Sequence, residues 1–315
     1  MVSSKISIPI PDEEILPKAN DLGALANRIN FETRKNHNKI DKTISVKLLI
    51  ALTDYRIWRQ GLQIFYHMFK NIEILINNEL DTLALSEGKT DIKYPNSDAF
   101  RFSPDQIQNI DKDLRVASIL YQFFDPKMYR AQNLRNDLLV FYNNKDSFES
   151  PMHLEQKKFV QHLYSTFQEK PHVLIAYCHV LYLALFAGGK LIRSSILKST
   201  GLFPDIEGKS KNEVVQMATT FFKFDVLDEN YFKIRYKTNY ELSTRLALTE
   251  QEKLDIIEES KYIFDTIYNC VKELEVYNTH RFNTKFKKMG YNAALFILFI
   301  LFLLYIRRLV LHIIY

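Results

Sequence analysis

The feature that most constrains the fold of this chain is the spacing of its apolar residues. They recur three or four positions apart along almost the whole length, and no stretch shows sustained alternation with a period of two. A period near 3.6 is that of an amphipathic α-helix, whereas a half-buried strand alternates at every second residue. Gly and Pro, which interrupt helices, number 8 and 9 among 315 residues. The sequence therefore predicts an all-α fold.

Capping residues and breakers predict where the helices begin and end. We expect a helix over 21–40 with Asp21 as its cap, and a long helix over 45–80 with a bend at Gly61. Ser103, Pro104 and Gln106 predict the start of a third helix. Further helices are expected over 155–168, 171–200, 230–246 and 249–280. The polar segment 86–98 is typical of a surface loop. Because no linker rich in Gly, Ser or Pro separates these helices, we expect one multi-helix domain over 21–283, preceded by a flexible N-terminus over 1–20.

The segment 284–315 has the composition of a C-terminal transmembrane helix. An unbroken apolar run over 293–306 follows three lysines and precedes Arg307 and Arg308. The run is shorter than the roughly 20 residues of a full span, so the helix must recruit residues 289–292 or continue past the arginines. The alternative is a buried core helix. If the lysines stay in the cytosol, the large domain faces the cytosol, and a short span fits the thin endoplasmic reticulum membrane.

Several classes of protein are disfavoured by composition. Lys and Arg exceed Asp and Glu by 42 to 37, with the two signs interleaved, so we expect no nucleic-acid partner. Cys178 and Cys270 lie far apart and are expected to be reduced, buried thiols. The chain has no glycine-rich phosphate loop, no G-x-S-x-G elbow and no H-E-x-x-H motif. Kinase and hydrolase activities are therefore not expected.

Two adjacent glycines interrupt the most apolar predicted helix of the domain. Gly188 and Gly189 stand within LIAYCHVLYLALFAGGKLIRSSI, and each costs the helix about 1 kcal/mol relative to alanine. Their missing side chains permit either close packing of another helix or passage of the backbone over a flat ligand. Spacing alone leaves both interpretations open.

Several segments, taken together, resemble haem oxygenases. The proximal helix of that family is similar to RINFETRKNHNKID, and its distal helix is similar to the helix that contains Gly188. Further resemblance lies in LQIFYHMFKNIEILI, in QKKFVQHLYSTFQEKPHVLIAYCHVLYLALFAGGK, and in TTFFKF followed by NYFKIRYKTNYE. These segments cover most of 21–241 in the order of the family. The resemblance implies a haem oxygenase-like helical domain.

The resemblance assigns roles to the residues around the proximal helix. His37 matches the iron ligand, and a neutral imidazole suits that role. Asp41, one turn later, matches a carboxylate that orients the ligand, although a solvated turn residue is the alternative. Thr33 and Asn30 share this helix and are expected in the haem-binding set, with Asn30 replacing a lysine near the propionates.

Three more residues match positions near the haem propionates. Lys233 and Lys237 are four residues apart on one helical face and match cations that pair with the carboxylates. Without the resemblance they would be ordinary solubilising charges. His179 stands where the family has a tyrosine, and an imidazole also donates hydrogen bonds.

The distal helix departs from the family at two positions. Leu185 stands where the family usually has an aspartate that organises water, and Ala184 replaces its first glycine. Gly188 and Gly189 match, so we expect these two glycines and Leu185 to form the wall over the reacting face. Because leucine cannot hold water, control of that face must come from backbone groups or another polar side chain.

The implied activity is oxidative opening of haem to biliverdin, carbon monoxide and ferrous iron. Haem is then substrate and cofactor together, O2 is consumed, and NADPH cytochrome P450 reductase is the expected electron donor. A shared membrane would raise the effective concentration of the two proteins. The process served is haem degradation and iron homeostasis. Leu185 makes a non-catalytic haem carrier or sensor the main alternative, and a membrane-tethered scaffold without haem is a third.

Overall fold

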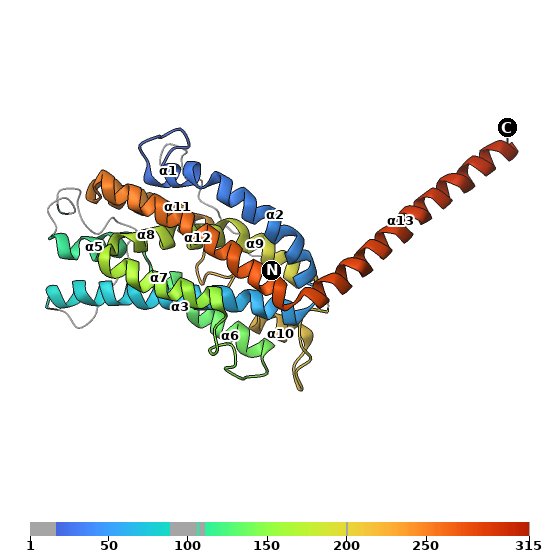
Figure 1. Ribbon diagram of the computed structural model, residues 1–315, viewed down its shortest axis with the longest axis horizontal. Helices are drawn as coiled ribbons and strands as arrows, with labels where there is room; N and C mark the ends of the chain where they lie inside the picture. Colours follow the sequence, from blue (N-terminus) through green and yellow to red (C-terminus); the bar gives the residue numbers. More distant parts are fainter. Residues whose placement is uncertain (1–16, 89–105, 107–110, 200, 315) are drawn as a thin grey trace.

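The computed structural model describes residues 17–88, 106, 111–199 and 201–314, and every regular element within them is a helix (Figure 1). The predicted all-α fold is confirmed. Its elements are α1 Leu25–Glu32, α2 Arg34–Ala51, α3 Tyr55–Ser86, η2 Lys112–Leu114, α5 Arg115–Phe123, η3 Pro126–Met128, α6 Ala131–Phe141, α7 Leu154–Glu169, η4 Pro171–Val173, α8 Leu174–Tyr177, η5 Cys178–Tyr182, α9 Leu183–Lys198, α10 Lys211–Met217, α11 Glu229–Ala247, α12 Glu250–Tyr277 and α13 Thr279–Ile314.

The long helix α3 runs through the middle of the domain and packs against α5, α6 and α7. Asp54 caps it by accepting a hydrogen bond from the Arg56 backbone N–H at 3.0 Å. On the other side of the domain, α12 packs against α1, α2 and α8, and α11 packs against α5. This arrangement leaves α2 and α9 on facing walls of a space closed by α3, α11 and α12.

The N-terminal helix boundaries differ from the sequence predictions. The helix predicted to end near Ile40 continues to Ala51, because no Gly or Pro interrupts the residues around Ile40, and α3 begins at Tyr55 rather than Ser45. Asp21 does not cap α1, which begins at Leu25 without a side-chain cap. Gly61, where a bend was predicted, lies inside the continuous helix α3.

The helices of the C-terminal half were predicted more accurately. Those expected over 155–168, 230–246 and 249–280 correspond to α7, α11 and α12, and the capping box of Thr249 with Glu252 is present. The helix expected over 171–200 corresponds to η4, α8, η5 and α9, and contains a π-helical segment at Cys178–Tyr182 that was not predicted. Cys178 and Cys270 are buried free thiols, as expected. The cap at Ser103 and Pro104 and most of the loop 86–98 lie outside the described residues.

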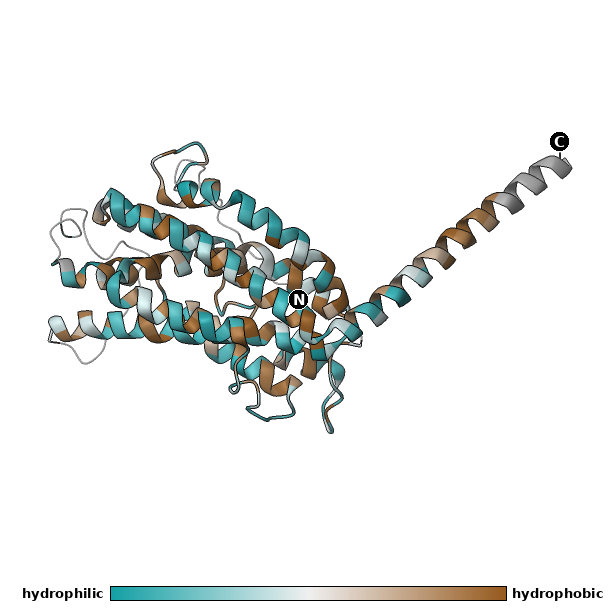
Figure 2. Ribbon diagram, viewed as in Figure 1, coloured by the Kyte–Doolittle hydropathy of each residue, from teal (hydrophilic) through white to brown (hydrophobic). Residues whose placement is uncertain are grey.

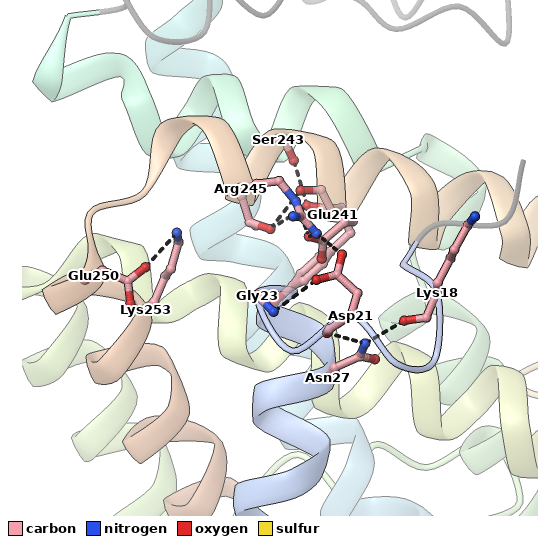
Figure 3. Close-up of polar contacts among 11 residues, drawn as sticks. Lys18, Asp21, Gly23, Asn27, Glu241, Ser243, Arg245, Glu250 and Lys253 are labelled. Atoms are coloured by element: carbon pink, nitrogen blue, oxygen red, sulfur yellow. Dashed lines mark hydrogen bonds and ion pairs between the residues drawn. The ribbon is translucent and has the colours of Figure 1, made fainter.

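A polar cluster holds the start of α1 against α11 (Figure 3). The Arg245 guanidinium donates a hydrogen bond to Asp21 and lies 2.6 Å from the Glu241 carboxylate. This hydrogen bond, and then the charge of Arg245, lower the pKa of Asp21. The Asn27 amide donates to the carbonyls of Lys18 and Asp21, both at 2.8 Å. The cluster therefore fixes where α1 meets α11, which matters because these helices carry predicted ligand-binding residues.

Helix α13 leaves the domain as a long rod whose middle turns are apolar (Figures 1 and 2). The segment Thr279–Leu304 is long and apolar enough to cross a membrane, and none of its most apolar window is buried in the domain. The segment Pro171–Lys198 meets the same criterion but is mostly buried, as expected of a core helix. A C-terminal candidate span is therefore present, and it is continuous with the turns of α13 that touch the domain.

Candidate functional site

A cavity of about 700 Å³ lies between the walls formed by α2 and α9. This volume is in the range of sites that hold small organic ligands, roughly 300–1,000 Å³. Its lining is mainly apolar and aromatic. The polar or charged residues that line it are Asn30, His37, Asp41, Lys47, Trp58, His179, Lys233 and Lys237. A largely apolar site with a few polar groups suits a flat apolar ligand that carries charge at one edge.

His37 lies one turn after the junction between α1 and α2. Thr33 forms that junction, and its hydroxyl donates to the Ile29 carbonyl at 2.7 Å, a bond that bends helices. The His37 ring lines the cavity and meets the Phe264 ring edge-on, with centroids 5.8 Å apart. Its side chain is exposed to the open cavity, so its nitrogens are accessible to a ligand.

Asp41 lines the same cavity one helical turn beyond His37. Among the described contacts, no hydrogen bond joins its carboxylate to the His37 ring, and both side chains are exposed. The two groups share a wall of the cavity, and the orienting role of Asp41 stays a prediction.

Gly188 and Gly189 line the wall formed by α9. A Cβ added at Gly188 would meet only the Ile192 side chain, at 3.9 Å, which is an ordinary contact. A Cβ at Gly189 would lie 3.3 Å from Leu185 and 3.9 Å from Phe222. Packing of another helix therefore does not require glycine at Gly188, and the open space beside it is the cavity itself. This geometry favours the flat-ligand interpretation of the glycine pair over close helix packing.

Leu185 lies on the same wall and is 7% exposed. Together with Phe222 it presents apolar surface beside Gly189. Trp58 packs near Phe222, with ring centroids 6.2 Å apart. Among the described residues, no carboxylate lines this wall. This part of the wall therefore presents apolar surface and no carboxylate that could organise water.

His179 lies in the π-helical segment and is almost fully buried at one end of the cavity. Its Nε2 is 3.4 Å from the Asn30 side-chain oxygen, and its Nδ1 has no described hydrogen-bond partner. Burial lowers the pKa of His179 to about 3, and the charge of Lys237 adds to the effect. The imidazole is therefore neutral across the physiological pH range.

We expect the variant His179→Phe to lose less stability in mild acid than the wild type does. Above pH 6.5, the ordinary pKa of histidine, His179 is neutral in both the folded and the unfolded protein. As the pH falls from 6.5 toward 3, only the unfolded chain takes up a proton at His179, so the wild type loses stability. Urea unfolding at about pH 7.5 and about pH 5 measures the difference. Equal acid sensitivity of the two proteins would contradict the burial of a neutral imidazole here.

Lys233 and Lys237 project from α11 into the same end of the cavity. Desolvation, and then the neighbouring charge of Lys233, lower the pKa of Lys237. Neither ammonium has an acidic partner among the described contacts, whereas Arg235 of the same helix is paired with Asp125 at 2.7 Å. Two partly buried like charges without a counter-ion favour binding of an anion.

The structure brings together nine of the ten predicted site residues. Thr33 is the exception: it is buried in the helix junction and does not line the cavity. Sequence reasoning missed the wall formed by α12, where Phe264, Ile267 and Val271 lie, and missed Phe282 of α13. These residues carry no motif, and their apolar periodicity is that of any core helix, so only the packing of the helices identifies them.

Comparison with known proteins agrees with the fold. The heme oxygenase family model matches residues 108–273, which is the C-terminal part of the domain without α2. Heme-binding protein HMX1 of Saccharomyces cerevisiae is 37% identical over 286 residues, covering 86% of this chain and 82% of the relative. Heme oxygenase 2 of Synechocystis is 22% identical over 257 residues, covering 80% and 83%.

Solved structures share the fold at low sequence identity. The heme oxygenase of Leptospira interrogans superposes with a TM-score of 0.56 at 20% identity, over 79% of this chain and 99% of the other. Heme oxygenase-1 of Synechocystis in complex with heme gives 0.57 at 17% identity, over 86% and 99%. At such identities the likeness establishes the fold alone.

Proposed function

Because the chain belongs to the haem oxygenase family, we propose that it binds haem in the cavity between α2 and α9 and opens the porphyrin ring to biliverdin, carbon monoxide and ferrous iron. One observation carries this proposal. The accessible imidazole of His37 lines one wall of the cavity, and the opposite wall has open space at Gly188, where no side chain projects. Haem is substrate and cofactor in this reaction.

The residues present fit haem on three counts. The cavity volume of about 700 Å³ and its apolar lining suit the ring. His37 offers an uncommitted imidazole, which is the donor that haem iron accepts while leaving the opposite face free. Lys233 and Lys237 lack counter-ions, and the two haem propionates would supply them.

When bound, haem supplies the iron at which O2 is reduced and the ring that is oxidised. The protein's own contribution is position and exclusion of water. His37 on α2 would hold the iron from one side, and the absence of side chains at Gly188 lets the ring lie close to the α9 backbone. Leu185 and Phe222 would keep water from that face. Lys233 and Lys237 would fix the rotation of the ring in its own plane.

We expect Lys237→Met to stabilise the haem-free protein and weaken haem binding by about tenfold or more, since a charged hydrogen-bond partner is lost. Burial and the charge of Lys233 lower the pKa of Lys237, so charged Lys237 opposes folding, and this penalty shrinks as the pH rises toward the lysine range. Urea unfolding and haem titration at neutral pH measure the two effects. Lys35→Met, an exposed change outside the cavity, is the control.

The ring-opening activity itself is tested with the full chain, haem, O2, NADPH and cytochrome P450 reductase. Decay of the Soret band together with release of carbon monoxide supports an oxygenase. Leu185 gives specific support to a second candidate, a haem carrier or sensor, since this wall holds no group that organises water. Stable haem binding with a persistent Soret band and no gas would establish that alternative and rule out the enzyme.

The proposal extends to where the reaction takes place. The apolar span in Thr279–Leu304 supports anchoring of α13 in a membrane. We place the domain on the cytosolic face of the endoplasmic reticulum, where a membrane-bound reductase is the electron donor. Such activity would serve haem degradation and the release of iron. Fractionation of cells with and without residues 284–315 tests the anchor, and loss of membrane association only in the shortened chain is expected.

A further inference from the structure

The cavity extends well beyond the level of His37, toward the end of the domain from which α13 leaves. Along α2 its lining runs from His37 to Ala51, and along α12 from Phe264 to Leu274. His37 meets Phe264, and Lys47 meets Glu275, so the two helices run side by side in the same direction. At 1.5 Å per residue, the cavity continues for about 15–20 Å past His37. We call this extension the apolar arm.

The apolar arm ends at the first turns of α13. Its lining near the end consists of Leu48 and Ala51 of α2, Leu274 of α12 and Phe282 of α13. Phe282 is 3% exposed and also lines an open groove on the outer surface, with Val276, Tyr277 and Phe286. The Phe282 side chain therefore separates the internal cavity from a surface groove at the base of the candidate membrane span.

Polar contacts hold the base of α13 on both sides of Phe282. On the near side, the Asn278 amide donates to the Gln60 side-chain oxygen of α3. The contacts on the far side and beside it come from α13 itself. Lys285 donates to the Thr53 carbonyl at 2.9 Å, and Arg281 lies 3.7 Å from the Asp54 carboxylate. The helix axis is interrupted at Asn278, which separates α12 from α13. The Phe282 side chain itself is held by apolar packing, so its removal would open the end of the arm while these polar contacts remain.

The charges that line the apolar arm limit which molecules can occupy it. Two charged residues among those described line the arm. Asp41, near its start, is a carboxylate that repels anions, and Lys47, near its end, is already paired with Glu275 at 2.8 Å. Haem and biliverdin each carry two carboxylates, and moving these through an apolar passage without partners is unfavourable. The accessible side of the cavity, where His37 and Ala184 are exposed, is the path for such ligands. The occupant of the apolar arm must be small and uncharged.

We propose that the apolar arm is a passage for uncharged diatomic gas between the reaction site and the membrane side of the domain, with Phe282 of the anchor helix as its gate. The inference rests on the proposed function, in which O2 is consumed and carbon monoxide is released. Apolar gases concentrate in the hydrocarbon of a bilayer. An opening at the base of the anchor helix would therefore connect the reaction site with the bilayer, where the gas is more concentrated than in water.

The test uses the full chain in phospholipid nanodiscs with zinc protoporphyrin as the ligand, which occupies the haem site and has a triplet state that O2 quenches. Phe282→Ala, or the milder Phe282→Leu, is expected to raise the quenching constant severalfold, because the gate is opened. Ala51→Phe is expected to lower it, because the arm is filled. The control is Phe31→Ala, an exposed phenylalanine of α1 that lies outside both the cavity and the groove. Equal constants for all variants would overturn the proposal.

A second readout needs no porphyrin. Trp58 is the sole tryptophan of the chain, is 6% exposed and lines the cavity. In the porphyrin-free protein, Phe282→Ala is expected to increase quenching of its fluorescence by O2 and not by acrylamide, which is polar and larger. An equal increase with both quenchers would mean general loosening and would refute a gate. If zinc protoporphyrin fails to bind, the proposed function fails, and Trp58 quenching still decides whether the arm admits gas.

Discussion

Replacing His37 by alanine is expected to abolish the histidine-ligated Soret band that forms when haem is added to the protein, and to reduce ring opening to background. Among the described residues His37 is the exposed imidazole on the α2 wall of the cavity, whereas His179 is almost fully buried at its other end. Removal of the ring leaves the iron without its protein ligand, while the apolar walls remain. Absorption spectra during haem titration measure the effect.

Two controls separate ligation from damage to the fold. His280→Ala removes an exposed histidine of α13 that lies outside the cavity and should leave the spectrum unchanged. Added imidazole should restore a six- or five-coordinate nitrogen-ligated spectrum to His37→Ala, because the vacated space lies in an open part of the cavity. If the Soret band of His37→Ala matched that of the wild type, another group would be the ligand.

Local sequence signals predicted the helices wherever the caps and breakers are strong. Thr249 with Glu252 gave the start of α12 correctly, because a capping box satisfies backbone donors that every helix start leaves unpaired. The break between α2 and α3 was misplaced by about ten residues, since Asp54 carries a weaker signal than a Gly or a Pro. The π-helical segment at His179 depends on tertiary packing and leaves no mark in the periodicity.

The candidate site was predictable to the extent that it lies in recognisable helices. His37, Gly188 and Lys237 come from segments far apart in sequence, and the resemblance to a known family brought them together before the fold did. Physical reasoning alone left the role of the glycine pair open. The contribution of α12 and of Phe282 was not predictable, because the walls of a cavity between helices are ordinary apolar residues whose partners only the packing determines.

The second large effect is expected from Gly188→Leu, which should weaken haem binding by roughly 5- to 150-fold, as inserting methylenes into filled space costs about 1–3 kcal/mol. In the haem-free protein the change is expected to be neutral or stabilising. A Cβ at Gly188 meets only Ile192 at 3.9 Å, and leucine is the better helix former by about 0.5–1 kcal/mol. Urea unfolding without haem and haem titration measure the two opposite effects.

A variant that is more stable without haem but binds haem more weakly shows that the glycine leaves room for the ligand. If the glycine served helix packing, its replacement would destabilise the haem-free protein. Gly189→Leu is the contrasting variant, because its Cβ would lie 3.3 Å from Leu185 and should therefore destabilise the haem-free protein as well. Ser194→Leu, exposed on the same helix outside the cavity, should change neither quantity appreciably. Should Gly188→Leu bind haem as tightly as the wild type, the ring does not lie against this turn of α9, and the proposed orientation of the ligand is wrong.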